Sequence, residues 1–521
     1  MAADKTNGNT GQRLVSNSCW SWFSEPRALH YSGAHDRTYF GYVTNAGAIM
    51  VGQYDHGANT LKTFTLGTFE PDDHNCPAIQ VLNDGRLIIF YSRHSADNVL
   101  RYRISSSPED IGTLGVERTL TTSGATTYAQ IVYNDPVIVI FHRVQVGNSA
   151  TQQRWSCQIS KDNGATWGTE IPVFDYGSSE QLYIKTSWRS SVAGNNAADI
   201  ILSGHPDMGS RHDVRYCYLR IGSASDITIR KPGAITLLDL NAPTGPISAD
   251  KTAVVYDPST NNGVKAWIWD VYATSASYIY CVYATFPSDT DHRYNYARYN
   301  PTTQQFDIKS EICAAGGYIG DGSQLHYSGG VSIAKRAGVQ DVIHTSQYST
   351  ESNKFEIVDF SSSDGGHAWT AVPRTNNSSV DNIRPVTVVN GRLDFSMYWA
   401  AGTYINYVTP TMDALVGSDG SVAQTQITLI PSTTTPAVGQ SVTFTATLRS
   451  GTTPLPSKSV TIYHYFNGVR YTDTTKTTNA AGQITLTQSF SSAAQRTYYA
   501  TFAGDGPYAS STGSVVTINV R

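Results

Sequence analysis

Short runs of hydrophobic residues recur along the chain from about residue 15 to about residue 415, separated by clusters of Gly, Asn, Asp and Ser. Examples are RLIIFYSR, PVIVIFHR, DVIHTSQY and RLDFSMYWA. Runs of this length between turn-forming residues are typical of β-strands. The pattern predicts a tandem series of small sheets.

The composition favours strands over helices throughout the chain. Its 521 residues include 32 Tyr and 43 Gly, and only 15% are charged. Aromatic and β-branched side chains fit a pleated surface, so we interpret the chain as all-β. A chain of this length is too long for one compact core, which predicts two domains.

Charge and hydropathy exclude two classes of partner. The net charge is −4, so no basic surface indicates binding to nucleic acid. No apolar run approaches the length of about 18 residues that a membrane-spanning helix needs. The sequence therefore predicts neither a nucleic-acid-binding protein nor a membrane span.

Two eight-residue segments share one pattern, SKDNGATW at residues 160–167 and SSDGGHAW at residues 362–369. They resemble the Asp box, S-x-D-x-G-x-x-W, of sialidase-like and related propellers. In such a turn Asp accepts backbone N–H bonds, Gly permits a positive φ, and Trp packs between sheets. We expect a structural role for both segments, away from substrate. At roughly 50 to 60 residues per four-stranded blade, the region is long enough for about seven blades of a β-propeller.

The composition changes after Pro410, where a Thr- and Ser-rich region with the alternating pattern of β-strands begins. We therefore predict a β-propeller catalytic domain over residues 15–415 and an immunoglobulin-like β-sandwich over residues 425–521. The motifs VGQSVTFTA, NAAGQITLT and FAGDGPYASS resemble bacterial Ig-like repeats of cell-surface and extracellular enzymes. The resemblance implies a secreted or cell-surface protein that attaches to a cell surface or polysaccharide through this domain. The first residues lack the basic-then-apolar order of a secretion signal.

The residues that could catalyse a reaction lie in two neighbouring predicted blades. The motif DDHNCP contains His74, and the strand pattern NDGRLIIFYSRH after it ends at His94. Next come Tyr128 in TTYAQIVY and Arg143 at the end of PVIVIFHR. A meander of strands brings residues at this spacing to one end of a sheet. Taken alone, each of these residues is more often an ordinary turn or strand-end residue.

Several motifs together resemble those of a known family. These are DDHNCPAI with NDGRLIIFYSRH, then QLYIKTSW, ILSGHPDMG, DHRYNYARY and LHYSGGVSI. In content and order they resemble the BNR-type propeller polysaccharide lyases that include the ulvan lyases. The resemblance implies a lyase that cleaves an acidic, uronate-containing, ulvan-like polysaccharide by β-elimination, leaving unsaturated uronate ends.

β-Elimination beside a uronate needs a base for the C5 proton, a neutraliser of the carboxylate and an acid for the leaving O4. The resemblance assigns His74 and Tyr128 to the base and acid roles without deciding which takes the proton. It places Arg143 against the carboxylate, which a planar guanidinium binds with two hydrogen bonds. His94 would orient or assist. Asn75 could bond the substrate or hold its neighbour in the turn. Tyr183, Lys185 and Tyr327 are candidate sugar-binding residues, although aromatic side chains also fill the interfaces between blades.

Two histidines and two cysteines form a second candidate group, His205, Cys217, Cys281 and His292. Each Cys and His pair brackets a strand, and four such ligands complete a tetrahedral zinc shell with a structural role. Some ulvan lyases of this fold hold a structural zinc, and the similar segments here imply one, with His212 as a substitute ligand. The alternative is two buried free thiols. No cofactor is expected for catalysis.

Two other functions remain open at this point. A sialidase-like glycoside hydrolase is suggested by the Asp boxes, but it needs an arginine cluster and a Tyr and Glu pair, and no Glu falls in a recognisable motif. A non-catalytic carbohydrate-binding or adhesin propeller is favoured by the Ig-like region, although not by the order of the His, Tyr and Arg residues.

Overall fold

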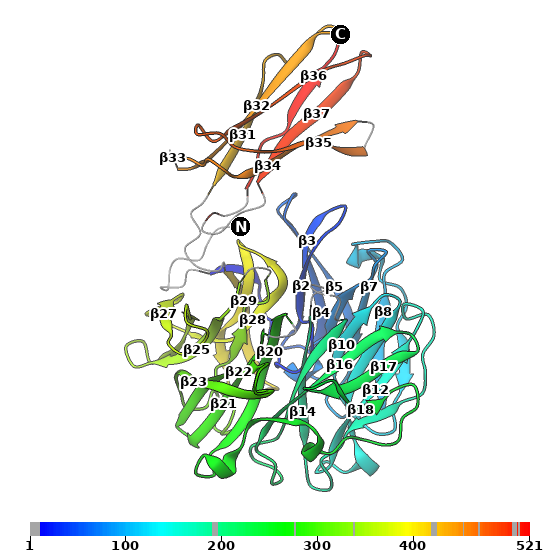
Figure 1. Cartoon of the computed structure of the whole chain (residues 1–521), viewed down its shortest axis with the longest axis vertical. Coiled ribbons are helices and arrows are strands. Elements are labelled where there is room, and N and C mark those ends of the chain that lie inside the picture. Colours follow the sequence, from blue (N-terminus) through cyan, green and yellow to red (C-terminus); the bar gives the residue numbers. More distant parts are fainter. Residues whose placement is uncertain are drawn as a thin grey trace. The chain divides into compact units, whose positions relative to one another are not determined.

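The computed structural model describes residues 11–189, 196–275, 278–336, 339–417, 425–451, 453–466, 469–502, 508 and 511–521. The chain divides at about residue 417 into two compact units, and the regular structure of both is almost entirely strand (Figure 1). The described ranges contain five one-turn 3-10 helices: η1 (Asp73–Asn75), η2 (Ile111–Thr113), η3 (Val146–Asn148), η4 (Ala249–Lys251) and η5 (Pro258–Thr260). In the same ranges no helix is long and apolar enough to cross a bilayer.

The first unit is a β-propeller whose described strands form seven antiparallel blades. The first three blades are β2 (Ala28–Ser32), β3 (Asp36–Val43), β4 (Ala48–Asp55) and β5 (Thr60–Thr68); β6 (Ala78–Val81), β7 (Leu87–Tyr91), β8 (Val99–Ile104) and β9 (Arg118–Thr121); and β10 (Thr126–Asn134), β11 (Val137–Gln145), β12 (Gln153–Ser160) and β13 (Ile171–Phe174). The fourth is β14 (Leu182–Trp188), β15 (Ala197–Gly204), β16 (Val214–Ser223) and β17 (Asp226–Lys231), extended by β18 (Ile235–Asp239) and β19 (Ala253–Tyr256).

The last three blades complete the ring. They are β20 (Lys265–Ser275), β21 (Tyr278–Ser288), β22 (Asp291–Asn300) and β23 (Gln305–Gly316); β24 (Val331–Ile333), β25 (Val342–Ser349), β26 (Lys354–Ser361) and β27 (Thr370–Pro373); and β28 (Asp381–Arg392), β29 (Phe395–Tyr404) and β30 (Pro410–Gly417) with β1 (Gln12–Val15). Strand β1 pairs with β30, so the outermost strand of the seventh blade comes from the other end of the propeller sequence. The expected all-β propeller with seven blades is confirmed.

Both Asp boxes join the third strand of a blade to the fourth, from β12 to β13 and from β26 to β27. In the first box Asp162 accepts a backbone hydrogen bond from Thr166 at 2.8 Å, and Gly164 has φ +83°. Trp167 packs against Phe90 of the neighbouring blade, with 5.5 Å between ring centroids. These contacts are the structural ones that the sequence pattern predicts.

The first strands of the blades form the inner ring, in which each contacts the next, and β2 pairs with β28. Residues 18–27, which we call the axial segment, cross the centre of this ring and are almost all buried. Cys19 forms a β-bridge with Val43 of β3, and Glu25 forms one with Gln130 of β10. The axial segment therefore bonds to strands of different blades and fills the middle of the propeller.

Buried charges lie where the axial segment meets the inner strands. Glu25 forms ion pairs with Lys185 of β14 and with Arg27, and Lys335 pairs with Asp270 at 2.7 Å. Burial alone would raise the pKa of Glu25, but Lys185 and Lys335 outweigh it and hold that pKa well below its usual range. Burial lowers the pKa of Lys185 to about 8. Glu25 therefore has one partner within the axial segment and one on the fourth blade, whereas Lys335 and Asp270 belong to neighbouring blades.

The second unit is an Ig-like β-sandwich. One sheet contains β31 (Gln426–Pro431), β32 (Ser441–Ser450), β33 (Thr453–Pro454) and β36 (Gln483–Ser489); the other contains β34 (Ser459–Phe466), β35 (Val469–Thr477), β37 (Gln495–Phe502), β38 (Ser511–Thr512) and β39 (Val516–Asn519). In β32 the alternate residues Val442, Phe444, Ala446 and Leu448 are buried in the core between the sheets. This alternation is the one that the sequence shows, so the predicted sandwich is confirmed.

Replacing Glu25 by Gln removes the negative charge that Lys185 and Arg27 face. Because breaking a buried ion pair leaves its partner charge uncompensated, we expect the free energy of unfolding to fall by about 3 to 5 kcal/mol. Denaturant unfolding followed by tryptophan fluorescence measures the change. The exposed Glu351→Gln is the matched control and should shift stability by less than about 0.5 kcal/mol. Equal effects of the two substitutions would contradict this account.

Candidate active site

The turn before β6 is held rigidly in place. Asp72 caps η1 by accepting the backbone N–H of His74 at 2.9 Å. The next residue, Asp73, forms an ion pair with the fully buried Arg384 of β28. Arg384 also donates to the hydroxyl of Tyr404 at 2.7 Å. The turn that carries His74 is thereby tied to the seventh blade as well as to its own.

His74 and His94 form a stacked pair, with ring centroids 4.0 Å apart and an interplanar angle of 14°. Both rings bond to Asp72: Nδ1 of His74 lies 2.6 Å from Oδ1, and Nδ1 of His94 lies 2.8 Å from Oδ2. One carboxylate therefore orients two imidazoles. His94, whose side chain is 27% exposed, is the more accessible of the pair.

The electrostatics of this group keep the carboxylate charged and His94 neutral. Burial acts to raise the pKa of Asp72, but the electrostatic attraction of His74 and the hydrogen bonds from both imidazoles outweigh it and hold the pKa far below its usual range. Burial, together with the neighbouring His74, lowers the pKa of His94, although Asp72 opposes this. At neutral pH Asp72 is ionised and His94 is an uncharged imidazole.

Tyr128 lies in a β-bulge near the start of β10. Thr127 is opposite Arg143 of β11, whereas Gln130 is opposite Phe141, so β10 contains one extra residue between these pairs. Tyr128 itself has φ +66°, a backbone conformation that bulky residues rarely adopt. Bulges redirect side chains, and strained backbone of this kind clusters at functional sites.

Arg143 lies over two tyrosine rings, with Cζ 4.7 Å from the ring centroid of Tyr128 and 4.7 Å from that of Tyr183. Burial acts to lower the pKa of Arg143, but Tyr183 and Tyr128 outweigh it, so the guanidinium is charged. Burial raises the pKa of Tyr128 well above its ordinary value, so the phenol is protonated. Oη of Tyr128 and Nη1 of Arg143 are both buried and have no hydrogen-bond partner among the described residues.

Two more rings complete the cluster. The hydroxyl of Tyr327 lies 3.1 Å from Nε2 of His74. Tyr407 packs edge-on against His74, with centroids 5.1 Å apart, and is partly exposed beside His94. The structure thus brings together six of the eight residues that the sequence proposes for catalysis and sugar binding: His74, His94, Tyr128, Arg143, Tyr183 and Tyr327.

The other two, Asn75 and Lys185, make hydrogen bonds or ion pairs within the fold. Asn75 is fully buried, and its amide bonds back to the carbonyl of Glu70 at 3.2 Å, so it supports the turn. Lys185 is enclosed beneath the axial segment, where it donates to the carbonyl of Trp22 and pairs with Glu25. Lys185 is therefore used to hold the fold, and the amide nitrogen of Asn75 supports the turn, which is the alternative role expected for Asn75 from the sequence.

The predicted Cys₂His₂ zinc shell is wrong. Cys217 is opposite Ile200 of β15, five residues before His205, which is roughly 16 Å along a strand. Cys281 is opposite Ala297 of β22, five residues beyond His292, at a similar distance. Both cysteines lie within their sheets, whereas both histidines lie at strand ends, so the four side chains do not meet.

His205 and His292 have other neighbours instead. His205 lies 4.8 Å from Trp267 and 5.7 Å from Tyr183, between ring centroids, and burial lowers its pKa to about 3. The ring of His292 is parallel to that of His326 at 6.3 Å. His205 therefore lies beside the tyrosine cluster, on the side away from His74.

Asp72 is the functional residue that the sequence analysis missed. Its signal was present, because it stands two residues before His74 in the DDHNC motif. Together the three side chains of Asp72, His74 and His94 offer ligand atoms within 4.8 Å of one another. The two oxygens of Asp72 already bond to one imidazole each, which accounts for the grouping without a metal ion.

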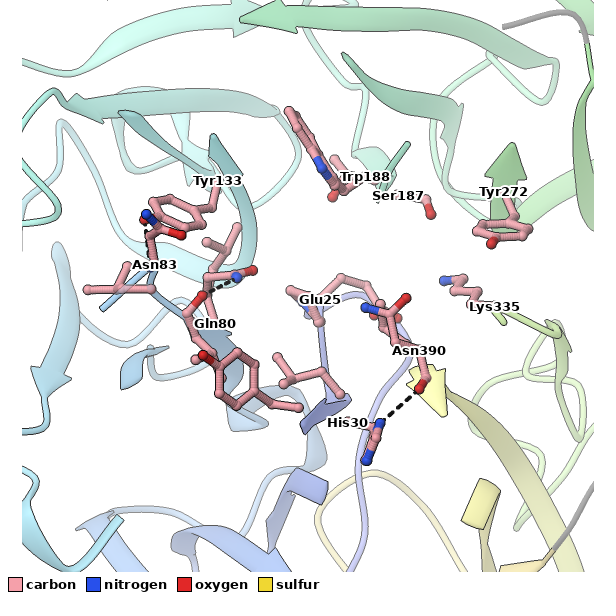
Figure 2. A pocket seen from close by; sticks show the side chains of 18 residues that line it. Glu25, His30, Gln80, Asn83, Tyr133, Ser187, Trp188, Tyr272, Lys335 and Asn390 are labelled. Carbon is pink, nitrogen blue, oxygen red and sulfur yellow. Dashed lines mark hydrogen bonds between the residues drawn. The ribbon is translucent and has the colours of Figure 1, made fainter. Parts of the chain in front are cut away.

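The opposite end of the propeller axis holds a cavity of about 340 Å³. Its lining includes residues at the C-terminal ends of inner strands, such as Tyr133 of β10, Trp188 of β14 and Tyr272 of β20 (Figure 2). The catalytic candidates lie at the end where the inner strands begin: His74 precedes β6, and Tyr128 is near the start of β10. The axial segment, which contributes Glu25 to the cavity wall, separates the two ends.

Comparison with known proteins bears on both units. Residues 37–310 match the family described as BNR repeat-containing family member, and residues 428–521 match the bacterial Ig-like domain, group 3. An ulvan lyase of Nonlabens ulvanivorans is 25% identical to this chain over 203 residues. The aligned region covers 34% of this chain and 41% of that protein, so the chain spans about two fifths of the length of this relative. The solved structure of an ulvan lyase, described as a new family of polysaccharide lyase, is 15% identical to this chain and superposes with a TM-score of 0.58. The match covers 79% of this chain and 95% of that chain, so the two proteins share a fold. Because the first match covers more than half of the sequence, the chain belongs to the BNR repeat-containing family and carries a C-terminal bacterial Ig-like domain.

Proposed function

We propose that this chain is a polysaccharide lyase that cleaves an acidic, uronate-containing, ulvan-like polysaccharide by β-elimination. The observation that carries the proposal is the pair of unpartnered buried groups, Oη of Tyr128 and Nη1 of Arg143, beside two imidazoles held by one carboxylate. Buried polar atoms without partners are costly, and a ligand that supplies the missing bonds offsets that cost. The similarity to an ulvan lyase supports the same substrate class.

Arg143 is the group for the uronate carboxylate. Its guanidinium is charged, it is held between the rings of Tyr128 and Tyr183, and Nη1 is available to an acceptor. Neutralising the carboxylate makes the C5 proton acidic enough to remove, because the charge that develops on deprotonation spreads onto the carboxylate. Arg143 in this role binds substrate and stabilises the intermediate.

The hydrogen bonds to Asp72 assign the protons on the imidazoles. A carboxylate only accepts hydrogen bonds, so Nδ1 of both His74 and His94 carries hydrogen, and Nε2 of the neutral His94 ring carries a lone pair. Nε2 of His74 is already bonded to the hydroxyl of Tyr327. Nε2 of the more exposed His94 is therefore the atom that we propose takes the C5 proton. This gives His94 a larger role than the orienting one expected from the sequence.

Tyr128 is then the proton donor to the leaving O4. Its raised pKa keeps the phenol protonated at neutral pH, as a general acid requires. Base, acid and neutralising group are all side chains in this scheme, so it uses no cofactor. We further propose that the protein acts outside the cell, where the Ig-like domain attaches it to a surface or to polysaccharide, as in the enzymes that its sequence resembles.

Tyr128→Phe removes the donor hydroxyl and keeps the ring that packs against Arg143. We expect turnover on ulvan, followed by the ultraviolet absorbance of the unsaturated uronate, to fall by at least about 10²-fold with substrate binding retained. Tyr348→Phe, at an exposed tyrosine of the same propeller, is the control and should keep full activity. Nearly full activity of Tyr128→Phe would overturn the assignment. Absence of the absorbance with every uronate polysaccharide would favour a binding propeller or a hydrolase.

Arg143→Lys keeps the positive charge and loses the planar pair of donors. We expect a large loss of kcat/KM on uronate substrates, by about 10-fold or more, because a bidentate contact to the carboxylate is lost. Circular dichroism and thermal melting check that the fold is kept. An unchanged kcat/KM would show that the carboxylate binds elsewhere.

Asp72→Asn tests the role of the carboxylate as a positioning group. The negative charge of Asp72 raises the pKa of His94, so its removal should lower that pKa further, and turnover at neutral pH should fall. Histidine NMR titration measures the pKa, with the His94 signal assigned from a His94→Gln spectrum. His464, which bonds to Asp473 in the Ig-like domain at 2.8 Å, is the internal control and should not shift. A His94 pKa that stays unchanged would contradict the geometry.

A further inference from the structure

Three potential metal ligands lie on one face of the first blade. His30 of β2 is opposite Thr38 of β3, and Thr38 is opposite Tyr54 of β4. Asp36 is two residues before Thr38, and His56 is two residues after Tyr54, so each lies on the same face as its neighbour two positions away. The register of three paired strands therefore sets the positions of His30, Asp36 and His56.

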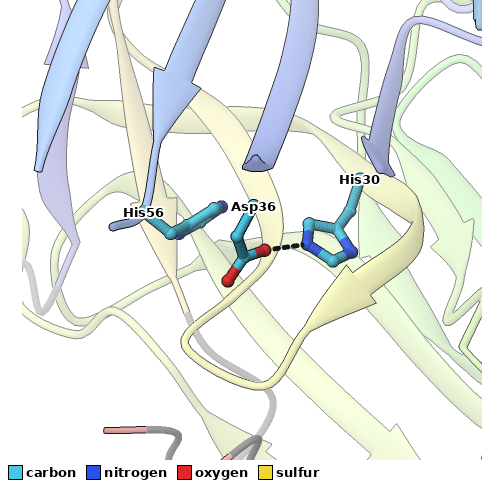
Figure 3. Close-up of side chains that lie close together, drawn as sticks. All are labelled: His30, Asp36 and His56. Carbon is cyan, nitrogen blue, oxygen red and sulfur yellow. Dashed lines mark hydrogen bonds and ion pairs between the residues drawn. The ribbon is translucent and has the colours of Figure 1, made fainter. Parts of the chain in front are cut away.

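The ligand atoms of these three side chains all lie within 4.8 Å of one another (Figure 3). Nε2 of His30 is 2.5 Å from Oδ1 of Asp36. The rings of His30 and His56 are 5.7 Å apart between centroids, at an angle of 73°. The backbone N–H of His56 donates to the carbonyl of Asp36 at 2.8 Å, which fixes the distance between their strands at this point.

The surroundings orient the His30 ring as a metal ligand is oriented. Nδ1 of His30 lies 3.1 Å from the carbonyl oxygen of Asn390, which only accepts, so this nitrogen carries hydrogen. The other ring nitrogen, Nε2, faces Oδ1 of Asp36. A metal-bound histidine with its other nitrogen bonded to a backbone carbonyl has this arrangement.

His56 has a comparable support. One ring nitrogen, Nε2, lies 2.8 Å from the hydroxyl of Thr38, a buried residue between the two histidines. Its ring packs edge-on against Tyr54, with centroids 4.9 Å apart. Both histidines are therefore held by neighbours outside the ligand group, so little side-chain freedom is lost when an ion binds.

We propose that His30, Asp36 and His56 bind one divalent transition-metal ion, with zinc as the best fit. Two imidazoles and one carboxylate are ligands that Zn²⁺ takes, whereas Ca²⁺ and Mg²⁺ select oxygen ligands. Three protein ligands leave a fourth position of a tetrahedral ion for water or for an oxygen atom of a bound molecule.

The site lies at the end of the propeller opposite the candidate active site. Asp36 follows the C-terminal end of the inner strand β2, and His30, in the middle of that strand, also lines the cavity of Figure 2. His74, in contrast, precedes the inner strand β6. The ion would therefore stabilise the fold and take no part in β-elimination. It would link the β2–β3 hairpin to β4 in the first blade, whose strand β2 pairs with β28 where the ring closes. The inference holds whether or not the proposed function is correct.

The test is a zinc titration of the metal-free full chain by calorimetry, with Co²⁺ absorption as a second readout of ligand geometry. We expect His56→Ala and Asp36→Asn to bind one equivalent less of Zn²⁺ than the unaltered chain. Zn²⁺ should raise the melting temperature of the unaltered chain and leave that of the two variants unchanged, since an ion that binds only the folded state stabilises it. His35→Ala, a change at an exposed histidine in the same hairpin, is the matched control and should behave as the unaltered chain.

His74 and His94 also offer ligand atoms and could bind zinc. The test therefore compares the zinc stoichiometry of each variant with that of the unaltered chain and does not rely on the stoichiometry of the unaltered chain alone. Equal zinc stoichiometry and equal melting shifts in His56→Ala, Asp36→Asn and the unaltered chain would overturn the proposal. Loss of zinc in His35→Ala as well would show an unspecific surface effect, and would also overturn it. Circular dichroism of each metal-free variant confirms that the blade is folded before the titration.

Discussion

The ion pairs of Glu25 with Lys185 and Arg27, buried in the middle of the propeller, are the interaction on which the rest of the structure depends. A charge is expensive to bury, so this carboxylate is stable there only while the inner strands supply cations on several sides. That requirement fixes the path of the axial segment. The segment in turn delivers the aromatic residues Trp22 and Phe23 against the inner faces of the blades.

The axial segment converts a ring of blades into a scaffold with two separate ends. At one end, Trp22 packs against Tyr327, whose hydroxyl bonds to His74, so the floor of the candidate active site is aromatic and buried. In such surroundings the charge of Arg143 is poorly screened, and its attraction for a carboxylate is stronger than in water. At the other end, polar and aromatic side chains surround a cavity that no part of the proposed chemistry uses.

The sequence was sufficient for the architecture and for most of the candidate site, because both leave local signals. The spacing of apolar runs and the two Asp boxes predict blades, since each blade is built from neighbouring strands. His94, Tyr128 and Arg143 follow from motifs in consecutive blades. The zinc prediction failed for a different reason: bracketing a strand with Cys217 and His205 says nothing about register, and five residues along a strand place the two side chains far apart.

The burial of individual side chains and the strained backbone at Tyr128 could not be predicted from the sequence either. Lys185 looks like a residue that meets a sugar, because lysine is usually exposed, and only the axial segment shows why it is enclosed. The bulge at Tyr128 has no signature in TTYAQIVY, which reads as a regular strand. Asp72 was overlooked because its function depends on two histidines 20 residues apart in sequence that meet only in the fold.

Closure of the ring by β1 and β30 sets an order for assembly. Gln12 lies opposite Val416, so a contact between the first and last strands of the propeller completes it. Closing a loop over this separation in sequence costs considerable chain entropy. The β1–β30 pairing therefore forms late, after the intervening blades have formed their local strand pairs. During synthesis the early blades must therefore persist with an open edge until the seventh blade emerges. The axial segment lies directly after β1, so the step that closes the ring also positions the residues that fill its centre.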